Sequence, residues 1–298
     1  MADSRKICAI LFAILAAALY AINAPLSKLL LRDISAAMMA AHLYLGAFLG
    51  MLIVSLITGK TGSAAKEKHL SKKDLPFVAG MILLDIAAPV LLMLGLKSTS
   101  AANASLLNNF EIAATSLFAL MLFHETVSRR LWLAIALVSI SSVILSFEGW
   151  QSLRFSSGSL LVLLACICWG LENNCTRVLS KKNPMEIVVL KGLGAGSGAL
   201  LIALGLGESF PGLIYTAGAL MLGFVAYGLS IFFYVLAQRE LGAAKTSTYY
   251  AVAPFIGAAI SLLVFRQIPT PSFLLALSIM MAGAWLASSQ GKSKRSRA

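Results

Sequence analysis

Residues 35–57 read SAAMMAAHLYLGAFLGMLIVSLI, and this stretch decides what kind of protein the chain is. It contains no Asp, Glu, Lys or Arg, and His42 is its only basic side chain. A helix rises about 1.5 Å per residue, so about 20 apolar residues span the hydrocarbon core of a bilayer. The stretch is therefore predicted to be a transmembrane helix.

The rest of the chain repeats this pattern of apolar runs separated by short polar breaks. Of its 298 residues, 59% are hydrophobic and 12% are charged, whereas soluble domains carry about 25% charged residues. The sequence thus predicts an all-α, polytopic membrane protein whose surroundings are the lipid bilayer. Ten transmembrane helices are expected, at residues 7–30, 35–57, 75–94, 99–123, 131–147, 158–179, 186–206, 214–236, 243–265 and 272–289.

The basic residues predict the orientation of these helices. If the amino terminus is inside, the inner segments hold eighteen of the 24 Lys and Arg residues, the outer segments hold five, and Lys191 falls within a span. Because cytoplasmic loops are enriched in Lys and Arg, both termini are predicted to be cytoplasmic, in a multi-pass protein of the cell inner or plasma membrane. The same placement explains the net charge of +12 without nucleic-acid binding.

A weak internal repeat divides the chain into two halves. Residues 100–146 align without a gap on residues 242–288 after a shift of 142, and the breaks between spans coincide. Ser105 then meets Ser247, and near the start of each half a shift of 149 places His42 opposite Lys191. Each half has five spans, and an odd number inverts the second half relative to the first. We therefore expect two inverted repeats, at residues 7–147 and 158–289.

Two segments resemble the drug/metabolite transporter superfamily, specifically its EamA-type members. The segment 99–107, TSAANASLL, followed by Glu111 and Glu125, is similar to the family's fourth helix. Leu163 through Trp169-Gly170, followed by Asn173, Thr176 and Arg177, is similar to its sixth helix. The resemblance covers residues 7 to 288 and implies ten helices around a central cavity, alternating access, and usually export of metabolites or amino acids.

Four positions depart from the family pattern. Tyr20-Ala21 stands where the first helix usually has an aromatic residue and Gly, and His42 stands where the second usually has Arg. Ile112 follows Glu111 in place of the common Pro, and Arg266-Gln267 occupies the place of a Gly-Glu pair. These departures bear on the substrate and leave the expected fold unchanged.

Ionisable residues inside the spans are the candidate site residues, because a charge at the centre of a bilayer costs at least about 3 kcal/mol by insertion scales. Glu111 shares a helix face with Asn108 and Thr115, at spacings of three and four residues. This face is interpreted as the wall of a cavity in which the carboxylate binds a cationic group or a proton. A purely structural ion pair is the alternative.

Asp85, Glu172 and Asn173 are also candidates. Asp85 lies four residues before Pro89, where a kinked helix with a carboxylate suits either a gate or a plain packing kink. Glu172 and Asn173 belong to the most polar patch within any span, so they either line the cavity or make hydrogen bonds between helices.

Three further candidate site residues are His42, Lys191 and Tyr249, and the sequence leaves more than one interpretation open for each. His42 suits proton coupling or a structural hydrogen bond. Lys191 is expected to pair with a carboxylate such as Glu111 or Glu172, and the sequence does not choose between them. Tyr249 and its neighbour Tyr250 offer an aromatic wall for a ligand, or simply pack in the core.

A secondary transporter for a small polar or amphipathic solute, with protons as a candidate coupling ion, is the function that these features favour. The chain has no Walker-A pattern, which argues against ATP as a direct energy source, and we expect no cofactor, no metal site and no catalytic residues. A membrane-embedded enzyme or a channel is the alternative. A homodimer remains open.

Overall fold

The structure, a computed structural model, describes residues 2–59, 69–123, 128–147, 155–180, 182–241, 246 and 249–288. Much of the charged loop at 58–74, Glu125, Arg154, Ser247 and the basic tail lie outside this description. The helices are α1 (Ala2–Ala21), α2 (Asn23–Leu30), α3 (Ala36–Gly59), α4 (Leu75–Ser98), α5 (Ala101–Leu107), α6 (Phe110–Phe123), α7 (Arg129–Ser146), α8 (Ser157–Leu179), α9 (Pro184–Gly205), α10 (Leu213–Gly223), α11 (Ser230–Leu241), α13 (Ala253–Val264) and α14 (Pro271–Ser288). A short 3-10 turn (η2, Lys72–Asp74) precedes α4, and a π-helical segment (η3, Phe224–Leu229) joins α10 to α11.

The expected all-helical membrane architecture is confirmed, but the count of ten spans is not. Eight helical stretches in the described residues are long and apolar enough to cross a membrane. Two more apolar helices, Ala253–Val264 and Pro271–Ala287, are shorter than that criterion. The first of these falls in the expected span 243–265, part of which lies outside the described residues.

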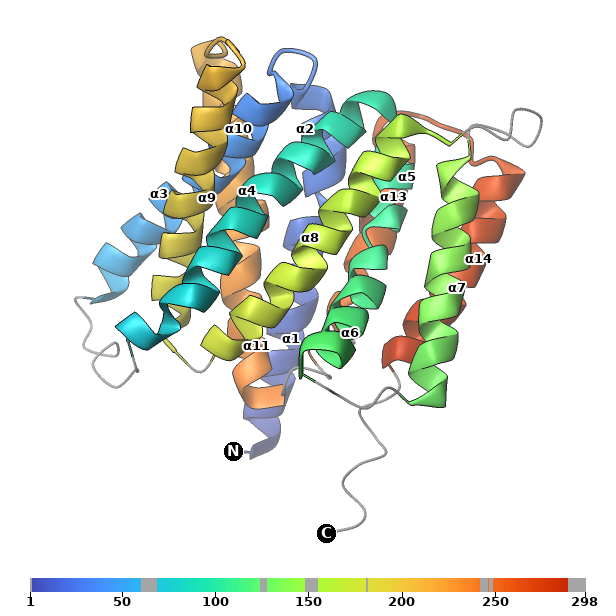
Figure 1. The fold of residues 1–298 in the computed structure, drawn as a ribbon, viewed down its shortest axis with the longest axis horizontal. Coiled ribbons are helices and arrows are strands. Elements are labelled where there is room, and N and C mark those ends of the chain that lie inside the picture. Colours follow the sequence, from blue (N-terminus) through green and yellow to red (C-terminus); the bar gives the residue numbers. More distant parts are fainter. Residues whose placement is uncertain are drawn as a thin grey trace.

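The helices pack into one bundle in which the two halves of the sequence are interleaved. α3 packs between α9 and α10, α4 packs on α8, α1 packs on α11, α5 packs on α13, and α7 packs on α14. The α7–α14 pair stands at one side of the bundle (Figure 1). The start of α1 and the end of α14 lie at the same end of the bundle (Figure 1). The bundle is therefore crossed an even number of times.

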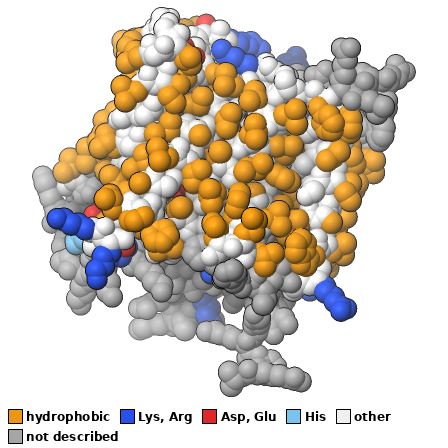
Figure 2. Space-filling model, viewed as in Figure 1, with side chains coloured by type: hydrophobic (Ala, Val, Ile, Leu, Met, Phe, Trp, Pro, Cys, Tyr) orange, Lys and Arg blue, Asp and Glu red, His pale blue; other side chains and the backbone are white. Residues whose placement is uncertain are grey.

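The outer surface of the bundle is apolar. Large side chains such as Leu83, Leu201 and Leu263 are mostly exposed, and in Figure 2 hydrophobic atoms cover the side of the molecule while charged side chains gather toward its two ends. A soluble protein rarely exposes an apolar surface of this extent. This surface is the expected lipid-facing belt.

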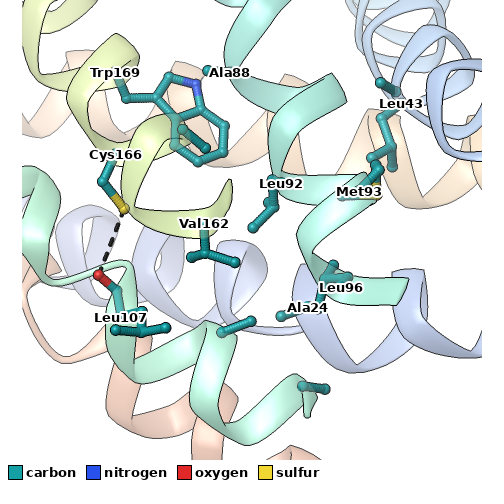
Figure 3. Close-up of a cluster of buried hydrophobic side chains, with 14 of the residues drawn as sticks. Ala24, Leu43, Ala88, Leu92, Met93, Leu96, Leu107, Val162, Cys166 and Trp169 are labelled. Atoms are coloured by element: carbon teal, nitrogen blue, oxygen red, sulfur yellow. Dashed lines mark hydrogen bonds between the residues drawn. The ribbon is translucent and has the colours of Figure 1, made fainter. Parts of the chain in front are cut away.

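The interior is packed with small and flexible apolar side chains. Leu92 and Leu96 of α4 and Val162 and Trp169 of α8 belong to one buried cluster (Figure 3). Lipid tails are as apolar as leucine, so helices in a membrane are held together by close packing and by hydrogen bonds between them. Polar side chains inside this bundle are therefore expected to have definite partners.

Several helices are interrupted near the middle of the bundle. The turn at Ile22 separates α1 from α2, and the turn at Asn108-Asn109 separates α5 from α6. α13 begins after a turn at residues 251–252. Prolines lie just after two of these turns, at Pro25 and Pro254, and proline supplies no backbone N–H to the preceding turn of helix. At the α5–α6 turn, the Cys166 thiol of α8 donates to the Leu107 carbonyl over 3.5 Å (Figure 3).

Candidate functional site

A buried ion triad lies at the centre of the bundle. Nζ of Lys191 in α9 lies 2.9 Å from a Glu172 carboxylate oxygen in α8 and 3.0 Å from an Asp85 carboxylate oxygen in α4. All three side chains are buried. The sequence left the partner of Lys191 open between Glu111 and Glu172; the structure pairs it with Glu172 and adds Asp85.

Two hydroxyl groups complete the triad. The Tyr44 hydroxyl of α3 donates to Asp85 over 3.0 Å, and the Thr176 hydroxyl donates to Glu172. The cluster therefore connects α3, α4, α8 and α9 through charged or polar groups. Hydrogen bonds to the carboxylates are what make a buried ion pair tolerable in a medium of low dielectric constant.

A second polar group surrounds Glu111 at the start of α6. The Asn173 amide of α8 donates to the Glu111 carboxylate over 2.6 Å and lies 3.2 Å from the Thr115 hydroxyl. The neighbouring Asn174 amide donates to the Thr115 backbone carbonyl over 3.2 Å. Glu111, Thr115 and Asn173, which the sequence put forward separately, are thus brought together at the α6–α8 contact.

Accessibility separates these two groups. The triad is almost fully buried, whereas Glu111, Thr115 and Asn173 each keep part of their surface accessible. Glu111 lies within electrostatic reach of all three members of the triad. Glu111 is therefore the least enclosed of the three carboxylic acids in this region.

The charges in this region do not balance. Asp85, Glu111 and Glu172 are three carboxylic acids, and Lys191 is the one basic side chain with which they interact electrostatically in the described residues. With every group ionised, the cluster carries an excess of negative charge at membrane depth. An excess of charge at this depth is costly unless it is compensated.

A row of tyrosine rings runs beside the carboxylates. Ring centroids are 5.0 Å apart for Tyr44 and Tyr227, 5.9 Å for Tyr20 and Tyr227, and 6.0 Å for Tyr20 and Tyr250. Tyr234 lies 5.0 Å beyond Tyr250. Such rings offer a polarisable wall with hydroxyl groups for a ligand in the centre of the bundle.

Three residues expected in the site lie outside the two polar groups described above: His42, Tyr249 and Asn108. His42 is buried, and its Nδ1 donates to the Met38 carbonyl of the same helix over 2.7 Å, the structural alternative considered from the sequence. Tyr250 is the ring that joins the tyrosine row; Tyr249 is partly accessible and makes no ring contact with the described aromatic residues. Asn108 stands in the α5–α6 turn, where its side-chain oxygen lies 3.8 Å from the Cys166 sulfur.

Sequence reasoning missed Tyr44 and Tyr227. Tyr227 sits in the π-helical segment η3, and its hydroxyl accepts a hydrogen bond of 3.0 Å from the Asn23 amide. π-Helical turns are frequent at functional sites, but their positions cannot be recognised from residue periodicity. Tyr44 lies two residues after His42 in an apolar span, so its pairing with Asp85 had no signal in the sequence.

The His, Cys, Asp and Glu side chains of the described residues are not grouped as metal ligands. No group of three His, Cys, Asp or Glu side chains among them is arranged to hold a metal ion. The polar groups instead form a compact cluster at the centre of an apolar helical bundle.

A charged cluster enclosed by lipid-facing helices defines a membrane transporter rather than a soluble domain. The chain belongs to the EamA-like transporter family, which matches residues 7–147 and 156–289. The family resemblance drawn from the sequence motifs is therefore confirmed.

Two similar proteins are named as uncharacterized transporters. An uncharacterized transporter of Methanothermobacter thermautotrophicus is 26% identical over 282 residues, covering 88% of this chain and 81% of that protein. The uncharacterized transporter YyaM of Bacillus subtilis is 24% identical over 222 residues, covering 71% of each. One solved crystal structure has the same fold, with a TM-score of 0.68 at 16% identity, over 97% of this chain and 99% of that one.

Proposed function

We propose that this protein is a secondary transporter that exports small polar or amphipathic metabolites, such as amino acids, by alternating access. The observation that carries the proposal is the partly accessible Glu111 beside a buried ion triad. Asp85, Glu111, Glu172 and Lys191 each lie at least seven residues, about 10 Å, from the nearer end of their helical span. Ionisable side chains at this depth mark substrate or ion pathways.

The packing pattern supports two inverted five-helix repeats, at residues 7–147 and 158–289. If each span in the first half corresponds to the span five places later, α3 packs on its counterpart α9, and α7 packs on its counterpart α14. Under the same correspondence, α1 matches α8, and α4 matches the span that contains α11. The α4–α8 contact therefore has the α1–α11 contact as its equivalent. A two-fold relation between the halves produces such a self-consistent set of contacts, and transport sites lie at the interface of such repeats.

In this mechanism the triad and Glu111 have different roles. The triad fixes α4, α8 and α9 to one another through Lys191, and Tyr44 adds α3. Glu111, held by Asn173, binds the substrate or a coupling proton. The tyrosine row supplies the wall against which an amphipathic solute packs.

The bias of basic residues supports a cytoplasmic location for both ends of the chain. The structure places the start of α1 and the end of α14 at one end of the bundle (Figure 1), as this orientation requires. The net charge of +12 is then concentrated on the side that faces the anionic inner leaflet.

Counterflow in proteoliposomes tests the proposal. Purified protein is first screened by thermal shift against amino acids and other small polar metabolites, because a ligand that binds only the folded state raises the apparent stability. A stabilising compound is then loaded inside vesicles, and uptake of the radiolabelled compound is followed. A carrier accumulates label transiently under these conditions, whereas a channel only equilibrates it, and an enzyme changes the compound chemically.

A variant pair links the activity to the cluster. Glu111→Gln should abolish counterflow or remove its dependence on a pH gradient, whereas Glu186→Gln should not. Glu186 is an acidic residue at the start of α9, where it pairs with the exposed His69 outside the cluster. Equal transport by the parent and Glu111→Gln would contradict the role given to Glu111.

A further inference from the structure

A small pocket lies where the interrupted helices meet. Its wall is made by residues at the α1–α2 turn, near the end of α5, and at the start of α13. The lining residues are Tyr20, Ala21, Asn23, Ala24, Ser105, Asn108, Ala253, Pro254 and Gly257. The pocket has room for about one water molecule, so it does not accept an organic substrate in this conformation.

Two residues of this wall, Ser105 and Ala21, carry oxygen atoms whose hydrogen bonding departs from the usual pattern. Ser105 is 2% exposed, and its hydroxyl has no hydrogen-bond partner in the described part of the chain. The Ala21 carbonyl lacks its helical donor, because the residue four positions later is Pro25. A buried hydroxyl or carbonyl without a partner is rare, and it indicates a missing ligand or water.

Gly257 shows that these two oxygen atoms converge. A methyl group placed on its Cα would come within 2.9 Å of the Ala21 carbonyl oxygen and 3.0 Å of the Ser105 hydroxyl. The two oxygens therefore lie no more than about 5.9 Å (2.9 plus 3.0 Å) from each other beside α13. Asn108, Tyr20 and Asn23 also line the pocket.

The charged residues near the pocket indicate whether its ligand is positively or negatively charged. Glu111 follows Asn108 by three residues, and it interacts electrostatically with Tyr20. With its carboxylates ionised, the central cluster carries more negative than positive charge, which favours a cation over an anion in this pocket. Unwound backbone carbonyls and the ends of half-helices bind small cations in other transporters built on broken helices.

We propose that this pocket binds a compact monovalent cation through neutral oxygen atoms of Ala21, Ser105 and Asn108. The cation is an alkali ion such as sodium, or the primary ammonium group of a solute that enters end-on. The proposal goes beyond the transport function, and it is tested by binding to the purified protein, so that its failure leaves the counterflow result untouched.

Thermal unfolding of the purified full chain in detergent provides the test. Sodium, potassium and methylammonium chloride are each titrated against choline chloride at constant ionic strength, because choline is too large for the pocket. At least one of the three small cations should raise the melting temperature of the parent, by mass action. A response to sodium or potassium assigns the pocket to an alkali ion, and a response to methylammonium alone assigns it to an ammonium group.

Variants of Ser105 locate the binding site. Ser105→Ala should raise the apparent dissociation constant of the cation at least tenfold. Ser105→Cys, nearly equal in size to serine, should do the same because sulfur is a poor ligand for a hard cation. The matched control is Ser142→Ala in α7, whose buried hydroxyl donates to the Val138 carbonyl away from the pocket; it should keep the full response. No response of the parent to any of the three cations, or an unchanged response in the folded Ser105 variants, overturns the proposal.

Discussion

Lys191 Nζ lies 2.9 Å from the Glu172 carboxylate, and this contact joins the middle of α9 to the middle of α8. The same ammonium group also contacts Asp85, so one lysine compensates two buried carboxylates. If Lys191 were removed, water could not take over its role of stabilising the two carboxylates, because the surrounding helices keep water out of the bundle. The stability of the bundle therefore depends on Lys191 more than on any charged residue at its ends.

The first prediction concerns this triad. Lys191→Met should lower the free energy of unfolding by about 3–5 kcal/mol, because it leaves uncompensated charges in the interior. Replacing the partners as well, with Asp85→Asn and Glu172→Gln, should recover most of the loss. The measurement is the temperature at which the detergent-solubilised protein loses its monodisperse gel-filtration peak.

A surface pair provides the control for the triad. Lys182 contacts Asp74 over 3.0 Å at the end of the bundle, and both side chains are partly accessible. Lys182→Met should cost at most about 1 kcal/mol. The triad interpretation fails if the triple variant is as unstable as Lys191→Met alone.

The second prediction concerns two helix ends with the same geometry and different residues. After α9, Gly207 has φ 72°, and after α13, Arg266 has φ 49°. In both turns the next residue donates its N–H back to the fifth residue before it, through Glu208 to Ala203 and Gln267 to Leu262. This left-handed position favours glycine.

Arg266→Gly should therefore raise the free energy of unfolding by about 0.5–1 kcal/mol, and Gly207→Ala should lower it by about 1 kcal/mol. Arg266→Ala separates the backbone effect from the loss of charge, since alanine is strained like arginine at this position. A gain in melting temperature for Arg266→Ala equal to that for Arg266→Gly would assign the effect to the charge.

The third prediction concerns the close approach of α3 and α10. A methyl group on Gly223 would overlap the Leu43 backbone carbonyl, and one on Gly46 would overlap the Leu220 carbonyl. Neither backbone can move without separating the helices. Gly223→Ala should thus destabilise the protein by about 1–3 kcal/mol or more. Gly205→Ala at the end of α9, where the added methyl meets no atom within 4 Å, should be neutral in the same heating assay.

The fourth prediction concerns orientation. An alkaline phosphatase reporter fused after Lys292 should be inactive, because the enzyme folds only outside the cytoplasm, whereas a fusion after Arg154 should be active. Exchange of Lys66, Lys68, Lys72 and Lys73 for Gln should weaken the orientation, since this loop holds the largest share of the basic residues. Strong activity after Lys292 would place the carboxyl terminus outside and contradict the proposed topology.

How much the sequence could predict depended on the range of the interaction. Composition and hydropathy predicted the helical membrane fold, and Ala36–Ile57 emerges as a single span close to the expected 35–57. The face shared by Glu111 and Thr115 was also predictable, because helical spacing is local. The 3.6-residue period says which side chains share a face, but not which helix that face meets.

The partners across helices were beyond local patterns for the same reason. Tyr44 and Asp85 are 41 positions apart in the sequence. The residues around Asp85 do not indicate that Tyr44 and Lys191 are its partners. The π-helical segment that carries Tyr227 changes the helical phase, so a regular period misplaces its side chain. His42 illustrates the opposite case, because the sequence offered proton coupling or a structural hydrogen bond, and the hydrogen bond is made within its own helix.

The last prediction concerns Glu111 as the coupling or substrate-binding carboxylate. Glu111→Gln keeps the shape of the side chain and accepts the Asn173 hydrogen bond of 2.6 Å, but it cannot take up or release a proton. Because Glu111 is outside the Lys191 triad, its neutralisation breaks no ion pair, and the variant should express and fold like the parent. Counterflow that is lost, or that continues with no response to a pH gradient, is the expected result.

A companion variant separates charge from geometry at this position. Asn173→Asp keeps the size of the side chain but replaces the amide donor that holds Glu111 by a second acid. It should shift the pH dependence of transport while leaving the Asp85–Lys191–Glu172 contacts in place. If Glu111→Gln folds normally and transports like the parent at every pH, Glu111 is a structural hydrogen-bond acceptor, and the proton or cation that balances the buried carboxylates must bind elsewhere in the cluster.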